Sequence, residues 1–208
     1  MKVKWITHAC IQLETDIGKI IYFDPYQLSG DLKKGDIILC SHDHFDHLSV
    51  NDIKQVATSK TKVIIPKSCS LDEEFDVIKL DIGESTQIDD IKIKAVPSYT
   101  IKLETHPKSN RWLGFIVTVD GKNIYHAGDT GKIEEMADFN NIDIAFVPVG
   151  GKYTMDFEEA AESIKLINPK IAIPIHNWEK PLEPFKKIVE KQIPNVKVEL
   201  LSNKTLEI

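Results

Sequence analysis

The stretch Ser41-His42-Asp43-His44-Phe45-Asp46-His47 places three of the seven histidines of this 208-residue chain within six positions, with two carboxylates between them. It follows residues 36–40, a nearly continuous apolar run that predicts a strand buried on both faces. Imidazole is the commonest metal ligand, and side chains two apart in an extended segment point to the same side. We therefore expect His42 and His44 to hold one metal ion, while Asp46 and His47 reach a second. The alternative, a histidine-rich surface loop, is disfavoured by this density of ligands at the end of a strand.

A pair of divalent ions needs further ligands, and two other strand ends offer them. Asp129 follows the predicted strand at residues 123–126, and His176 ends the apolar strand at residues 171–175. Taken alone, the first is a typical turn residue and the second a typical structural histidine. If these strand ends share an edge with residues 41–47, their side chains converge, as is usual for sites in layered folds.

The rest of the chain alternates short strands with amphipathic helices. The Asp120-Gly121 pair predicts a tight hairpin, and Asp156 with Glu159 predicts a helix start. We expect helices at residues 50–58, 133–139, 156–167 and 182–191, and further strands at 3–7, 11–14, 19–23, 62–65, 91–96, 113–119, 144–147 and 197–201. This order favours an α/β sandwich of two sheets with helices outside, which periodicity alone does not separate from other layered α/β folds. Without a linker or repeat, residues 1–208 are predicted to form one domain.

The motifs together resemble the metallo-β-lactamase superfamily, whose order is followed along most of the chain. They are His42-x-His44-x-Asp46-His47, Gly128-Asp129-Thr130 and His176. The resemblance implies a four-layer αββα sandwich with metals at one edge of two facing sheets. Three more stretches are similar to a branch of zinc-dependent hydrolases related to ascorbate-6-phosphate lactonases and N-acyl-phosphatidylethanolamine phospholipases, namely Trp5-Ile6-Thr7-His8-Ala9, Phe23-Asp24-Pro25-Tyr26 and Met155-Asp156-Phe157-Glu158-Glu159-Ala160.

The resemblance also implies how the ligands are shared. His42 and His44 would hold the first ion and Asp46 and His47 the second. Asp129 would bridge both ions, and His176 would complete the second site.

The chain departs from the superfamily pattern at the third histidine of the first ion. The expected place reads Ala95-Val96-Pro97-Ser98-Tyr99-Thr100 and contains no histidine. His106 is the nearest candidate, since its loop can fold back, and otherwise Tyr99 or water takes the position. The resemblance places His8 near the site mouth, as a supporting or substrate-contacting group. Asp24 is either an acceptor for a ligand imidazole N–H or a simple Asp-Pro turn.

A His and Asp ligand set without cysteine suits Zn²⁺, two ions per chain, although Mn²⁺, Fe²⁺ or Ni²⁺ are compatible. Related di-iron oxygen reductases carry Glu at the position of His44, which argues against a redox site. The sequence therefore predicts a zinc-dependent dinuclear hydrolase. A hydroxide bridging the metals, oriented by Asp46, would cleave an ester, lactone or phosphoester. The site would keep about one positive charge, so a small anionic substrate is favoured.

Composition limits the alternatives. Lys and Arg number 26 against 32 Asp and Glu, a formal charge of −6, so no nucleic-acid partner is expected. A nuclease is the rival enzyme, and a metal-dependent binding protein without turnover is the rival class. No run of about 18 apolar residues or signal peptide is found, so no membrane partner is expected. Three widely spaced cysteines favour a reducing cytoplasm, and a homo-oligomer is compatible with the sequence.

Overall fold

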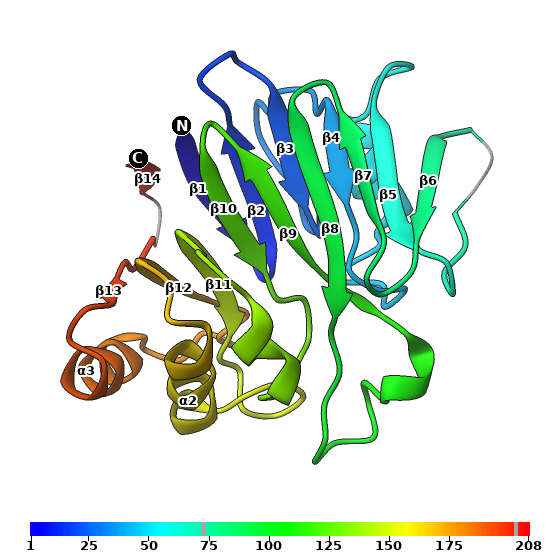
Figure 1. Cartoon of the computed structure of the whole chain (residues 1–208). Coiled ribbons are helices and arrows are strands. Elements are labelled where there is room, and N and C mark those ends of the chain that lie inside the picture. Colours follow the sequence, from blue (N-terminus) through cyan, green and yellow to red (C-terminus); the bar gives the residue numbers. More distant parts are fainter. Residues whose placement is uncertain (72–73, 202–203) are drawn as a thin grey trace. The chain divides into compact units, whose positions relative to one another are not determined.

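The computed structural model describes residues 1–71, 74–201 and 204–208. The chain divides into two compact units, each built on its own seven-stranded sheet (Figure 1). Unit 1 comprises Met1–Asp81 together with Leu201–Ile208, and unit 2 comprises Ile82–Leu200. That residues 1–208 act as one domain stays a prediction.

The sheet of unit 1 has the order β14-β1-β2-β3-β4-β5-β6. Strands β14 to β3 pair antiparallel, and β3 to β6 pair parallel. Strands β1, β3 and β4 therefore run in the same direction, and their carboxyl ends lie at one edge of the sheet. The helix α1 (Val50–Val56) begins at Ser49, whose side chain caps the amide of Asp52. The strands are β1 (Lys2–Thr7), β2 (Cys10–Glu14), β3 (Ile20–Phe23), β4 (Ile37–Leu39), β5 (Lys62–Pro66), β6 (Asp76–Leu80) and β14 (Thr205–Glu207).

The sheet of unit 2 has the order β13-β12-β11-β10-β9-β8-β7. Strands β7 to β10 pair antiparallel, and β10 to β13 pair parallel. Strands β8, β10 and β12 thus share a direction and end at the same edge. The strands are β7 (Ser85–Ile88), β8 (Ile91–Pro97), β9 (Leu113–Val119), β10 (Lys122–His126), β11 (Ile144–Pro148), β12 (Ile171–Ile175) and β13 (Lys197–Val198). The helices are α2 (Phe157–Ile167), α3 (Glu183–Gln192) and the 3-10 turns η1 (Lys108–Asn110) and η2 (Glu134–Asp138).

Local chemistry explains the start of α2 and the β9–β10 hairpin. Asp156 caps α2 by accepting the amide of Glu159 at 2.8 Å, as predicted. Asp120 and Gly121 both have left-handed backbones, with φ of 51° and 69°, which is the geometry of the predicted β9–β10 hairpin. The three cysteines, Cys10, Cys40 and Cys69, are buried thiols.

Two predicted elements differ from the structure in type or extent. The helix expected at residues 133–139 is a short 3-10 helix, Glu134–Asp138, and Ile133 before it supplies no side-chain cap. The strand expected at 197–201 ends at Val198. Among the described residues, no helix combines the length and the apolar composition needed to cross a membrane.

Candidate metal centre

In unit 1 the candidate residues follow three strands that run in the same direction. His8 comes directly after β1, Asp24 directly after β3, and the segment 41–47 after β4. A backbone hydrogen bond connects two of these strand ends, since the Asp24 amide donates to the Leu39 carbonyl of β4 at 2.8 Å. The edge of one sheet thus gathers side chains that are remote in the sequence.

Asp24 is the organising group of this edge, and its side chain is fully buried. One carboxylate oxygen accepts the Ser41 amide at 2.7 Å, and the other accepts the Ser41 hydroxyl at 2.8 Å. The second oxygen also lies 2.8 Å from Nδ1 of His47. Because an ionised carboxylate only accepts hydrogen bonds, His47 must donate from Nδ1.

The same reasoning fixes the tautomer of His42. The Ser41 hydroxyl donates its hydrogen bond to Asp24, and the Ser41 oxygen lies 2.8 Å from Nδ1 of His42. The His42 ring therefore donates from Nδ1 to the Ser41 oxygen. Asp24 in this way leaves Nε2 of both His42 and His47 with its lone pair, the form that a metal ligand requires.

The ring of His42 lies between two other imidazoles of the motif. Its centroid is 4.1 Å from that of His47 and 4.6 Å from that of His44, and its Nε2 lies 3.0 Å from Nδ1 of His44. A basic ring nitrogen held this close to a second ring nitrogen is chemically suited to share a cation. The donor set of unit 1 therefore fits a divalent metal.

Asp46 and His8 form the outer part of the unit 1 site. Nε2 of His8 lies 3.1 Å from a carboxylate oxygen of Asp46, and its ring contacts that of His47 at 5.4 Å. Burial raises the pKa of Asp46, but the His8 hydrogen bond and the nearby His47 outweigh burial and lower the pKa below its ordinary value. The lowered pKa favours the carboxylate form of Asp46, which can ligate a metal or accept a hydrogen bond.

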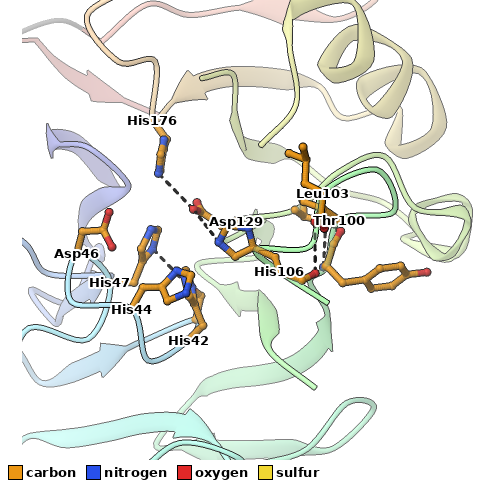
Figure 2. Close-up of polar contacts among 12 residues, drawn as sticks. His42, His44, Asp46, His47, Thr100, Leu103, His106, Asp129 and His176 are labelled. Carbon is orange, nitrogen blue, oxygen red and sulfur yellow. Dashed lines mark hydrogen bonds and ion pairs between the residues drawn. The ribbon is translucent and has the colours of Figure 1, made fainter. Parts of the chain in front are cut away.

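Unit 2 brings together three of the predicted ligands, with two imidazoles beside one carboxylate oxygen of the third (Figure 2). Nε2 of His106 and Nε2 of His176 each lie 3.3 Å from Oδ2 of Asp129. All three residues are at most 4% exposed. They follow β8, β10 and β12, whose carboxyl ends meet at the same edge. The predicted fold-back of the His106 loop therefore occurs, and its ring reaches Asp129.

The fold-back is closed by hydrogen bonds at the base of the loop. The Thr100 amide donates to the His106 carbonyl at 2.8 Å, and the Thr100 hydroxyl donates to the carbonyl of Leu103 at 2.5 Å (Figure 2). The His106 ring then packs edge-on against Trp112, with centroids 5.5 Å apart. A histidine outside the expected stretch is in this way delivered to the strand end.

Tyr99 anchors the loop rather than lying among the ligands. Its carbonyl accepts the Gly131 amide at 2.9 Å, two residues after Asp129. Its hydroxyl donates to Glu135 at 3.0 Å and accepts Nζ of Lys108 at 3.1 Å, while Lys108 also pairs with Glu135 at 2.9 Å. The hydrogen bond of Lys108 to Glu135, and to a smaller extent that to Tyr99, raise the pKa of Lys108 to about 12. Tyr99 thus connects the His106 loop to the segment that carries Asp129.

Some members of the site were missed by the sequence reasoning. Ser41 is hydrogen-bonded to both Asp24 and His42, and Glu135 accepts hydrogen bonds from Tyr99 and Lys108. Serine beside a histidine motif and one glutamate among many carry no distinguishing signal. His126 packs in the core, where its Nδ1 accepts the Gly128 amide at 3.3 Å and shapes the turn before Asp129.

The chain is similar to known proteins over most of its length. The family model described as "Beta-lactamase superfamily domain" matches residues 2–176. A curated UPF0173 metal-dependent hydrolase of Pyrococcus abyssi is 33% identical over 211 residues, covering 91% of this chain and 92% of its own. A solved structure from Parabacteroides distasonis has a TM-score of 0.82 at 31% identity, covering 95% of this chain and 91% of the other. A metallo hydrolase of Ignicoccus hospitalis, 26% identical, also has a TM-score of 0.82 and covers 100% of this chain and 98% of the other.

Proposed function

The chain belongs to the metallo-β-lactamase superfamily and its metal-dependent hydrolases, and on this premise we propose that it cleaves an ester, lactone or phosphoester bond of a small anionic substrate with two Zn²⁺ ions. The resemblance and the αββα sandwich class expected from the sequence are confirmed by the same likenesses. The substrate class, the number of ions and their identity are the proposal.

One observation carries the proposal. Two imidazoles whose Nε2 atoms lie 3.3 Å from the same oxygen of Asp129, all in a buried setting, form a donor set that suits a divalent cation. His and Asp donors without cysteine favour Zn²⁺, although this choice is loose. Bound divalent ions would supply an ionised water and polarise the bond to be cleaved.

We assign the ligands within each unit. In unit 1, His42, His44, Asp46 and His47 would hold metal, as the superfamily resemblance implies. In unit 2, the resemblance implies Asp129 and His176, and we add His106 because its Nε2 lies 3.3 Å from Asp129.

The chain's own groups then have defined tasks. Asp24 and Ser41 hold His42 and His47 in the tautomers that leave Nε2 basic. Asp46, kept ionised by His8, orients the attacking water and can receive its proton. Bound divalent ions would outweigh the carboxylate charges of Asp46 and Asp129, which favours an anionic substrate although the whole chain is acidic.

The test is metal content together with hydrolysis. Purified wild-type protein should contain two Zn²⁺ ions per chain by elemental analysis and should hydrolyse at least one member of a panel of phosphodiesters, lactones and esters. Asp129→Ala should bind at most one ion and lose hydrolysis. A wild type that binds no divalent metal, or an Asp129→Ala variant with unchanged activity, would contradict the proposal.

A further inference from the structure

Trp178 is a large aromatic side chain held half-exposed beside a proposed ligand. It lies two residues after His176, its ring meets that of His176 edge-on with centroids 5.5 Å apart, and it is 49% exposed. Trp112 in the same unit is only 6% exposed. Trp178 therefore does not serve as an ordinary core residue.

The backbone around Trp178 is strained. His176, Trp178 and Glu179 all lie in the left-handed region, with φ of 50°, 49° and 59°. Residues other than glycine seldom adopt this conformation, and three within four positions need support from their surroundings. The turn is closed by the Lys180 amide, which donates to the carbonyl of Asn177 at 3.0 Å. Strained backbone conformations of this kind are common at active sites and ligand-binding sites, where a side chain is held in one orientation.

Gly150 makes room for the indole. A Cβ placed on Gly150 would stand 2.4 Å from Cδ1 of Trp178 and 2.8 Å from its Nε1, so the ring lies directly against this backbone. Lys180 adds a further tie, because its Nζ donates to the carbonyl of Gly150. The indole is therefore fixed on one side and exposed on the other.

A second ring extends this surface. Tyr153 lies with its centroid 6.0 Å from that of Trp178, and Nζ of Lys152 stands 4.8 Å over the Tyr153 ring. We call Trp178 and Tyr153 the aromatic platform. Flat rings that are rigid and partly exposed bind planar groups by stacking at a small cost in conformational entropy.

We propose that the aromatic platform binds a planar aromatic group of the substrate, joined to the bond that is cleaved next to His176. This inference rests on the proposed function, which it deepens by naming the substrate class. Trp178 and Tyr153 are then specificity-determining residues, and a substrate with a ring attached directly to its phosphate or acyl group fits the short distance between Trp178 and His176.

The test compares phenyl phosphate with methyl phosphate, which share the phosphate group and differ in the ring. Binding of each to the zinc-loaded full-length chain is measured by titration calorimetry. Wild type should bind phenyl phosphate about three- to tenfold more tightly than methyl phosphate. Trp178→Ala should lower the affinity for phenyl phosphate more than that for methyl phosphate, so that the preference disappears, and Trp178→Phe should retain most of it. Ile17→Ala, which removes an apolar residue that is 64% exposed in unit 1, is the matched control and should change neither affinity.

The outcomes separate the two proposals. A wild type that binds both phosphates equally, or a Trp178→Ala variant that keeps the preference, overturns the aromatic platform and leaves the hydrolase proposal standing. A ring preference that depends on Trp178 in a zinc-loaded protein that cleaves no ester, lactone or phosphoester supports the platform and overturns the hydrolase proposal. Absence of binding by either phosphate overturns the platform.

Discussion

Asp24→Asn changes one buried carboxylate into an amide of the same shape, and its effect follows from the hydrogen-bond inventory. Asp24 accepts three hydrogen bonds from Ser41 and His47. An asparagine offers one accepting oxygen, so its NH₂ group must face donors. If the NH₂ group faces His47, that ring has to accept at Nδ1 and carry its proton on Nε2, which removes it as a metal ligand.

The magnitude can be stated for two measurements. Loss of a group that orients ligands lowers metal affinity about 10- to 100-fold, or about 1.4–2.7 kcal/mol. The metal-free protein should also lose about 2 kcal/mol of unfolding free energy, since hydrogen bonds to a buried charge are lost, and for a chain of this length that lowers Tm by about 4–8 °C.

The assay is zinc affinity by chelator competition, with urea unfolding of the metal-free protein alongside. Asp52→Asn is the matched control. Asp52 is a buried carboxylate of the same unit, 7% exposed, and accepts the amides of Gln27 and Leu28 at 3.1 and 2.8 Å. It should lose stability while keeping zinc affinity. Wild-type zinc affinity in Asp24→Asn would refute the tautomer argument.

Three more perturbations test other parts of the structure. Tyr99→Phe removes the hydroxyl between Glu135 and Lys108 and should lower the free energy of unfolding by about 1 kcal/mol, a value discounted because these hydrogen bonds are partly exposed. The zinc content per chain, measured by elemental analysis, should also fall, and an unchanged zinc content would argue against an anchoring role. Asp156→Ala removes the α2 cap from the Glu159 amide and should lower the unfolding free energy by about 1 kcal/mol in urea titration, and a stability gain would contradict it. Chelation of bound zinc should lower Tm, and re-addition of zinc should restore it, because a ligand that binds only the folded state stabilises that state. A Tm that does not change on chelation would contradict metal binding by the folded chain.

Local signals explain which elements the sequence predicts well. Helix α2 was predicted from Asp156 onward because its cap and its apolar face lie within a single segment. Strands β6, β7 and β14 were missed, and each is short and lies at or near a sheet edge. The residues of β7 (Ser85–Ile88) alternate between exposed and partly exposed, so no buried face marks them in the sequence. Such strands are defined by their pairing with a neighbour, which depends on the tertiary fold.

The candidate site divides in the same way. The motif at His42 to His47 was visible because its candidate ligands lie close together in the sequence. Asp129 needed the resemblance to distinguish it from a turn residue, and His176 needed it to be distinguished from a structural histidine. His106 could be suggested only as a nearby histidine. Its delivery to Asp129 depends on Thr100, and no periodicity encodes a loop closed by a backbone hydrogen bond.

The site edges of both units share a physical device. His8, Asp24 and His176 each come directly after a strand and each has a left-handed backbone, with φ of 49°, 42° and 50°. This conformation costs about 1–2 kcal/mol per residue outside glycine. It breaks the extended backbone of the strand, so the regular alternation of side chains stops at that residue. Glycine would satisfy the backbone but could neither ligate nor orient a ligand. Under the proposed function, ligation and ligand orientation at the strand ends explain the residues at these positions. The burial of the two sheets offsets the conformational cost.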